Sequence, residues 1–289
     1  MTDGDRFQRF LFEDLGVRGE FIRLDASWRA VLACHDYTPA VYRQLGQAIA
    51  ATVLLAGTIK FKGSLILQIH GDGPLHTLVA QSTHARTLRG LARCKGDVGD
   101  GTLSEMYGSG RLVLTIDAEG AERYQGIVAL EGNNLAEVIE IYFTRSEQLS
   151  THLWLAANEE RAVGMFIQEL PSHDSVAADW ERIAMLADTV TEQEMLTLPT
   201  EELLFRLFNE ERVRLFQPEP VAFRCGCSRE RIEATLVALG STEVQSIVSE
   251  FGAVDVDCEF CNRRYHFDPV DVDGLFAIGT VMEGSTTRH

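Results

Sequence analysis

The sequence predicts an α+β protein in three parts: a mostly antiparallel sheet packed with helices, a helical linker, and a small C-terminal module. Residues 63–83 contain two strand-like runs joined by the turn signal GDGP, and residues 110–132 repeat this arrangement around a turn at 117–120. Strands joined by short Gly-containing turns favour an antiparallel sheet with helices packed on it. The composition then changes near residue 171, and four of the six cysteines follow in the last part of the chain.

The remaining patterns of the first part complete an N-terminal domain predicted at residues 1–170. Residues 40–58 are strongly apolar with high helix propensity, which predicts a buried helix. Residues 134–149 carry large apolar side chains at helical spacing and predict an amphipathic helix. Residues 151–158 and 161–170 are apolar runs that predict a closing pair of strands.

Residues 171–220 are predicted to be an acidic helical linker, with 4 Lys+Arg against 11 Asp+Glu. Thr191 and Glu194 fit a capping box, in which each side chain bonds the other residue's backbone N–H. Residues 201–216 mix large apolar side chains with charges and predict amphipathic material. A segment so short and self-repelling is expected to fold only by docking on another surface. An ordinary inter-domain linker is an equally good interpretation.

Composition and charge exclude several classes of protein. The net charge is −17, which opposes non-specific binding to nucleic acid. The first ten residues contain no apolar run typical of a signal peptide, and the weakly charged stretch at 44–59 is too short to span a bilayer. We therefore expect a soluble, intracellular protein with no membrane partner. In a reducing compartment, paired cysteines more often indicate metal or redox chemistry than permanent disulfides.

The cysteine pairs predict a zinc site in a module at residues 221–289. The pattern is Cys225-x-Cys227 followed by Cys258-x-x-Cys261. Four soft ligands in two close pairs suit tetrahedral Zn²⁺. A module of about seventy residues makes a poor core unaided and often needs a metal.

Other residues near the pairs support this prediction. Gly226 is free to adopt a positive φ and let the chain fold around the ion. His266 is an alternative ligand, although four cysteines already fill the site. Two helices are expected between the pairs to build a small core. Their apolar positions are Ile232, Leu236 and Leu239 in the first, and Val244, Ile247, Val248 and Phe251 in the second.

The residues alone leave four functions open. The site is either a structural zinc module in a binding protein or a redox switch, because zinc-bound thiolates still react with oxidants that reach them. A zinc-dependent nucleic-acid binder would need a basic face, yet residues 221–289 have 6 Lys+Arg against 11 Asp+Glu. A thiol oxidoreductase acting through Cys258 and Cys261 would normally place the C-x-x-C motif at a helix start.

The whole chain resembles the redox-regulated 33-kDa heat-shock chaperone family of bacteria. The likeness begins with FRCGCSRERIE and CEFCNRRYHFD around the four cysteines. It extends, in the same order as in the family, through the segments RFLFEDLGVRGEFIRLDASW, GSLILQIHGDGPL, RYQGIVALEG, YFTRSEQL and RLFNEERVRLF. Residues 279–289 carry no recognisable motif.

The resemblance implies a cytoplasmic stress-response holdase that needs no ATP and is not an enzyme. It implies an inactive form in which Cys225, Cys227, Cys258 and Cys261 hold one Zn²⁺. Oxidants would then form the disulfides Cys225–Cys227 and Cys258–Cys261, release zinc, and unfold the module and the linker, which the resemblance implies to be metastable. The active protein would be a homodimer that binds unfolded clients and passes them to downstream refolding chaperones.

No other motif indicates a catalytic or cofactor site. Cys34 and Cys94 are expected to be small buried hydrophobes without a special role. Lys60 and Lys62 are expected to face solvent. No P-loop, no H-E-x-x-H and no G-x-S-x-G occurs in the sequence. Three tryptophans, at 28, 154 and 180, are expected in the core or at interfaces.

Overall fold

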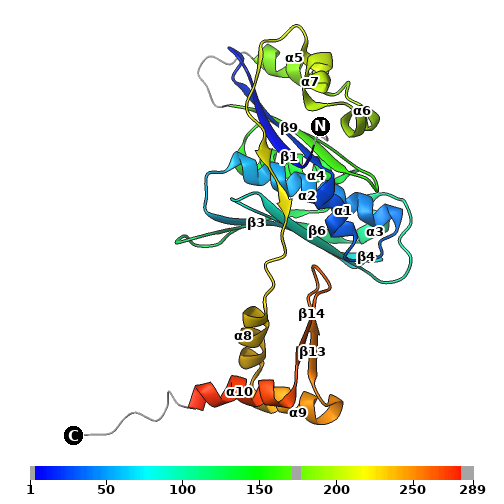
Figure 1. The fold of residues 1–289 in the computed structure, drawn as a ribbon. Coiled ribbons are helices and arrows are strands. Elements are labelled where there is room, and N and C mark those ends of the chain that lie inside the picture. Colours follow the sequence, from blue (N-terminus) through cyan, green and yellow to red (C-terminus); the bar gives the residue numbers. More distant parts are fainter. Residues whose placement is uncertain (1–3, 171–176, 281–289) are drawn as a thin grey trace, which may run out of the picture. The chain divides into compact units, whose positions relative to one another are not determined.

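The computed structural model describes residues 4–170 and 177–280, which divide at Arg224/Cys225 into two compact units. The first unit contains two sheets and the helices around them (Figure 1). The second contains three helices and one hairpin. This bears out the predicted α+β class. The predicted division at residues 170 and 220 stays a prediction, and the segment 171–176 at its first boundary lies outside the described residues, as does most of the tail 279–289.

All strand pairings of sheet A are antiparallel, and a segment from late in the chain pairs with its β1 edge. Its strand order is β10-β1-β2-β9-β8, and β11 also pairs with β1. The strands span Arg6–Phe12 (β1), Val17–Leu24 (β2), Thr151–Ala157 (β8), Ala162–Glu169 (β9), Val213–Leu215 (β10) and Glu219–Pro220 (β11). The predicted closing pair is thus confirmed as β8 and β9, whereas β1 and β2 were not assigned from the sequence.

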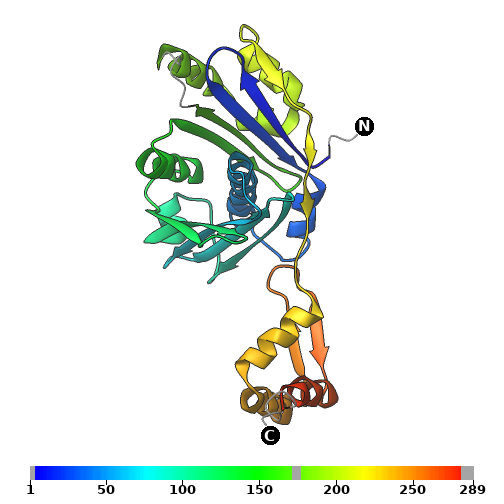
Figure 2. The same ribbon diagram turned by 90° about the vertical axis from the view of Figure 1, so that its left-hand side faces the viewer.

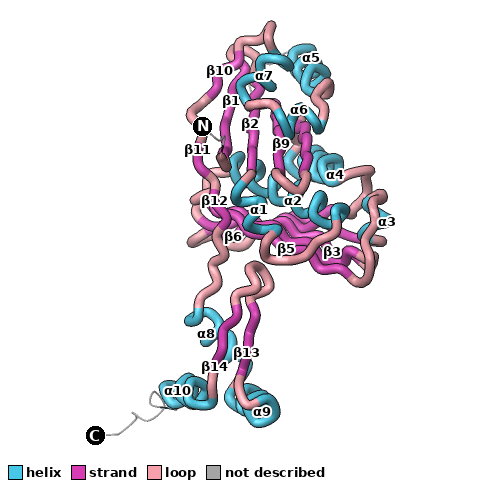
Figure 3. The backbone as a smooth tube through the Cα atoms, turned by 45° about the vertical axis from the view of Figure 1, so that its right-hand side comes forward, coloured by secondary structure: helices cyan, strands magenta, loops and turns pink. Residues whose placement is uncertain are grey.

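Sheet B has the order β12-β5-β4-β3-β6-β7, with a parallel pairing only between β12 and β5. Its strands span Gly63–Gly71 (β3), Leu75–Thr83 (β4), Thr87–Cys94 (β5), Gly110–Ala118 (β6), Tyr124–Ala129 (β7) and Ala222–Phe223 (β12). The turns between β3 and β4 and between β6 and β7 lie where the two Gly-containing signals predict them. Strands β10, β11 and β12 follow one another along the edges of both sheets (Figure 3).

Helix α2 (Pro39–Thr58) forms the centre of the first unit. It contacts strands of both sheets, and Figure 2 shows it enclosed between them. Residues such as Leu45, Ile49 and Leu54 are fully buried in the larger apolar core. The predicted buried helix at 40–58 is therefore confirmed. The shorter helices α1 (Ala26–Leu32) and α3 (Leu103–Tyr107) pack beside the sheets.

The amphipathic segment at 134–149 is helical, but not as one regular α-helix. Helix α4 covers Leu135–Tyr142, and a π-helical turn, η1, covers Phe143–Glu147. Gln148 then ends the segment in the left-handed conformation, with φ of 55°. Single π-turns of this kind are often found at functional sites.

Three helices after residue 176 cover one face of sheet A. They are α5 (Ala177–Ala187), α6 (Glu192–Thr197) and α7 (Thr200–Phe208). The predicted capping box of Thr191 and Glu194 is present at the start of α6. Phe208 of α7 packs edge-to-face on Phe12 of β1, with ring centroids 4.8 Å apart. The segment after residue 200, which is expected to fold by docking on another surface, is therefore docked on sheet A through α7.

The linker predicted to be helical over residues 171–220 is not helical throughout, and residues 213–215 form a strand instead. Helix α7 ends at Phe208, and Val213–Leu215 form β10 instead. The edge of β1 offers unpaired backbone groups, and Val213, Arg214 and Leu215 pair with them in antiparallel register. A tertiary partner therefore decided this local structure.

Candidate metal centre

The four predicted cysteines meet in the second unit. The Sγ atoms of Cys225, Cys227, Cys258 and Cys261 all lie within 4.8 Å of one another. The Sγ–Sγ distance is 3.6 Å between Cys225 and Cys258, and 3.4 Å between Cys227 and Cys261. Four ligands held about 2.3 Å from a tetrahedral zinc ion lie about 3.8 Å apart, so the donor set and its spacing fit such an ion.

A helix start and a hairpin turn position the two cysteine pairs. The Ser228 side chain caps α8 (Arg229–Leu239), and the Arg231 guanidinium donates to the Gly226 carbonyl over 2.8 Å. The second pair lies between β13 (Val254–Asp257) and β14 (Arg264–Phe267). There the Cys258 N–H donates to the Arg263 carbonyl over 2.9 Å.

The expected positive φ at Gly226 is not observed. Asn262 adopts the left-handed conformation instead, with φ of 53°, and its N–H donates to the Cys258 carbonyl. Asparagine tolerates this conformation better than most residues do. The tight reversal of the chain therefore lies in the C-x-x-C pair rather than in the C-x-C pair.

The cysteines belong to the small core of the second unit. Cys258 is 9% exposed and clusters with Leu236, Val244 and Phe267, and the other three cysteines pack against this cluster. The two predicted helices are present as α8 and α9 (Ser241–Phe251), and α10 (Pro269–Thr280) adds a third. Two expected core residues are not buried, since Leu239 and Phe251 at the helix ends are 53% and 71% exposed.

Burial and hydrogen bonds set the pKa of Cys227 apart from those of Cys225 and Cys261. Burial alone would raise the pKa of Cys227, but the Tyr265 hydroxyl donates to its sulfur over 3.2 Å, and with the neighbouring thiols lowers this pKa to about 7. Burial raises the pKa of Cys225 and that of Cys261. Tyr265 was not identified from the sequence, although an aromatic hydroxyl four residues after Cys261 is a recognisable signal.

The alternative ligand, His266, lies outside the cluster. Its Nδ1 is 2.9 Å from the Asp255 carboxylate across the β13–β14 hairpin, and the side chain is exposed. The pairing of Cys225 with Cys227 and of Cys258 with Cys261 stays a prediction, because the sulfur contacts of 3.6 Å and 3.4 Å each join one cysteine from each motif.

The two lone cysteines differ from each other. Cys34 is half-buried, and its thiol lies 3.2 Å from the Ala30 carbonyl. Cys94 is exposed at the end of β5, so the expectation that it is buried is wrong. Lys60 and Lys62 are exposed, as expected. Trp28 is fully buried, whereas Trp154 and Trp180 pack at the edge of the smaller core of the first unit.

Within residues 4–170 and 177–280, the helices are too short or too polar to cross a lipid bilayer.

Comparisons with known proteins agree over the full chain. The family model described as Hsp33 protein matches residues 5–268. The chain is 65% identical over 289 residues to a 33 kDa chaperonin of Nitrosococcus oceani and 45% identical over 297 residues to one of Pseudomonas aeruginosa, with all of each chain covered. The crystal structure of the 33 kDa chaperonin of Thermotoga maritima has the same fold, with a TM-score of 0.85 at 22% identity, covering 96% of this chain and 99% of that one. This chain belongs to the Hsp33 protein family.

Proposed function

We propose that this protein is a redox-regulated holdase, a chaperone that binds unfolding proteins without ATP and prevents their aggregation. Its relatives are named chaperonins, which supports a chaperone rather than an enzyme. The observation that carries the regulatory part is that all four clustered thiols are also members of one small apolar core. A chemical change at the sulfurs must therefore change the stability of the whole second unit.

In the inactive form, Cys225, Cys227, Cys258 and Cys261 hold one Zn²⁺. A bound ion of this type contributes on the order of 10–16 kcal/mol to the folding of a small module. The second unit has few fully buried apolar residues of its own, among them Val244 and Phe267. Without its four sulfur donors this core is too small to keep the module folded.

Oxidation removes those donors. Two cysteine thiols lose two electrons and two protons to one molecule of hydrogen peroxide, so that one S–S bond forms and two molecules of water are released. The proposed products are Cys225–Cys227 and Cys258–Cys261. Cysteines so close in sequence find each other readily, because the loops they close are short.

The surface for clients is the apolar face of sheet A that α5, α6 and α7 cover. Its core residues from the sheet include Phe10, Phe21 and Ile167, and those from the helices include Leu203 and Leu207. The helices connect to the cysteine module through a chain segment with only the short strands β10, β11 and β12. Loss of the module's fold releases one end of this segment, and the helices then detach and present two apolar surfaces.

The proposal includes the setting of the protein. It acts in the cytoplasm during oxidative stress, functions as a homodimer when active, and passes its clients to refolding chaperones. Acidic residues of the linker keep the client complex soluble, since the chain carries a net charge of −17.

The test compares two cysteine variants with the wild type. Peroxide treatment of the zinc-loaded protein should release zinc, consume four thiols and switch on suppression of client aggregation, followed by light scattering. Cys258→Ser should bind zinc weakly and be partly active without oxidant, while Cys94→Ser, which changes an exposed cysteine outside the cluster, should behave as wild type. Full activity of the reduced, zinc-loaded protein, unchanged by oxidant, contradicts the switch and leaves a static zinc module.

The geometry disfavours a thiol oxidoreductase. Residues Cys258 and Cys261 lie in the turn between β13 and β14, not at the start of a helix. A helix N-terminus is what stabilises the reactive thiolate in such enzymes. Reduction of insulin disulfides at a catalytic rate would restore that alternative.

A further inference from the structure

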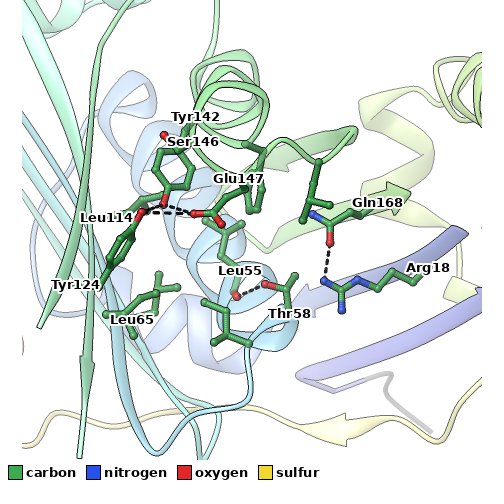
Figure 4. A pocket seen from close by; sticks show the side chains of 14 residues that line it. Arg18, Leu55, Thr58, Leu65, Leu114, Tyr124, Tyr142, Ser146, Glu147 and Gln168 are labelled. Carbon is green, nitrogen blue, oxygen red and sulfur yellow. Dashed lines mark hydrogen bonds between the residues drawn. The ribbon is translucent and has the colours of Figure 1, made fainter. Parts of the chain in front are cut away.

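A cavity of about 470 Å³ opens in the first unit, and all the residues that line it belong to that unit. Arg18 of β2 and Gln168 of β9 line it from sheet A, and Leu65 of β3 and Leu114 of β6 line it from sheet B. Leu55, near the end of α2, lies between them (Figure 4). The volume falls in the range of sites that hold small ligands or single side chains.

Most of the lining is apolar, and the polar groups gather at two places. Leu55, Leu65, Leu114 and Phe143 present hydrocarbon to the cavity. Such a wall favours an aliphatic group, since burial of each CH₂ is worth about 0.8 kcal/mol. The two polar places then decide what head group an aliphatic ligand needs.

The first polar group is the Arg18 guanidinium, a positive charge that forms no direct ion pair among the described residues. Its Nη2 donates to Gln168 Oε1 over 2.6 Å, and Gln168 in turn donates to Thr151 over 2.9 Å, which fixes the orientation of the group. Among the described residues no carboxylate lies within ion-pair distance of Arg18, and its Nε is buried without a hydrogen-bond partner. Burial lowers the pKa of Arg18, the nearby charge of Glu20 opposes this shift, and that of Arg9 adds to it. Figure 4 shows the guanidinium directed toward the cavity.

The second polar group is the Glu147 carboxylate, which carries a negative charge and already has hydrogen-bond partners. The Tyr142 hydroxyl donates to Glu147 over 3.0 Å, and the Tyr124 hydroxyl lies 3.2 Å from that of Tyr142. The π-helical turn η1 places Glu147 here, one residue before the left-handed Gln148. A fixed negative charge on this wall disfavours ligands with two or more negative charges, such as phosphates.

We propose that this cavity binds an amphiphilic monoanion, namely an aliphatic chain that ends in a single carboxylate. The carboxylate pairs with Arg18, and the hydrocarbon lies along Leu55, Leu65 and Leu114. Free fatty acids and the apolar C-terminal residue of a peptide both have this chemistry. The proposal does not depend on the holdase function, because no residue of the cavity belongs to the cysteine module.

Titration of decanoate into the reduced, zinc-loaded full chain tests the proposal, with calorimetry as the readout. We expect saturable binding at one site, weakened at least about tenfold by Arg18→Gln, because a charge-assisted hydrogen bond is lost. Lys60→Gln removes an exposed cation that does not line the cavity and should leave binding unchanged. Ser146→Trp places a large side chain at an exposed lining position and should abolish binding.

Further ligands separate the contribution of the carboxylate from that of the hydrocarbon, and compare fatty acids with peptide chain ends. Decanol lacks the carboxylate and should bind to the wild type as weakly as decanoate binds to Arg18→Gln. A leucine tripeptide with a free C-terminus, compared with its amide, shows whether chain ends are accepted as well as fatty acids. Tryptophan fluorescence and zinc content confirm that each variant is folded. Absence of saturable decanoate binding to the wild type, or equal affinity in Arg18→Gln, overturns the proposal.

Discussion

Glu219 joins two arginines that lie far apart in the sequence: its Oε2 accepts from Arg86 Nε over 2.7 Å, and its Oε1 accepts from Arg9 Nη1 over 2.6 Å. Arg9 belongs to β1 of sheet A, and Arg86 precedes β5 of sheet B. The Arg86 guanidinium also lies over the Phe7 ring, 3.7 Å from its centroid. Glu219 thus links the end of the linker segment to Arg9 in sheet A and to Arg86 beside sheet B.

Glu219→Gln should weaken the attachment of the linker segment to Arg9 and Arg86. A charge-assisted hydrogen bond is worth up to about 3 kcal/mol, and partial exposure of Glu219 reduces the expected loss to about 1 kcal/mol. Amide hydrogen exchange should become faster in residues 177–223, and less peroxide should be needed for activation. Glu210→Gln makes the same charge change at an exposed residue of the same segment and is the matched control. Equal exchange rates in both variants would show that Glu219 does not hold the linker segment on the sheets.

Glu20 should make the first unit less stable as the pH rises. Burial raises the pKa of Glu20 to about 7 against the opposing effect of Arg9, and its Oε2 is buried without a partner. The folded protein therefore keeps a proton on Glu20 up to about pH 7, whereas the unfolded chain loses it near pH 4.5. The stability that this group contributes is fully present below pH 4.5 and is lost as the pH rises to about 7.

Glu20→Gln should remove this dependence, because the amide stays neutral. The melting temperature of the variant relative to wild type should increase between about pH 4.5 and pH 7. Tryptophan fluorescence is a suitable probe, since Trp28, Trp154 and Trp180 all lie in the first unit. A difference that does not change with pH would mean that Glu20 is already ionised in the folded protein.

Phe208→Ala should expose the covered face of sheet A without oxidant. Phe208 is 2% exposed and packs on Phe12, so its truncation costs about 3–5 kcal/mol of local stability. The reduced, zinc-loaded variant should suppress client aggregation in light scattering. Phe205→Ala on the same helix, where the side chain is 71% exposed, should remain inactive until oxidised. If the Phe208 variant is folded, loosened and still inactive, the client surface lies elsewhere.

Tyr265→Phe should weaken metal binding while preserving the fold. Its hydroxyl donates to the Cys227 sulfur over 3.2 Å, and loss of a partner that orients a ligand typically costs about 10–100-fold in metal affinity. Competition with a chelator measures the affinity. His266→Asn is the control, because that side chain is exposed and outside the sulfur cluster. A larger loss in the histidine variant would identify His266 as a ligand after all.

The sequence by itself determined the features that depend on local chemistry. The spacing of Cys225, Cys227, Cys258 and Cys261 predicted the sulfur cluster, because only close pairs supply two ligands from one turn. Thr191 and Glu194 predicted the start of α6, since a capping box is complete within four residues. The apolar run at 40–58 predicted α2, and the Gly-containing turns predicted the hairpins of sheet B.

Only the tertiary structure decided the features that depend on partners distant in the chain. Val213–Leu215 became a strand because the edge of β1 was open to it, and Glu219 met Arg9 and Arg86 only when both sheets had formed. Likewise, Arg18 and Leu114 line one cavity although 96 positions separate their numbers in the chain. Periodicity and spacing record which face of an element is buried, but they carry no information on which other element covers that face.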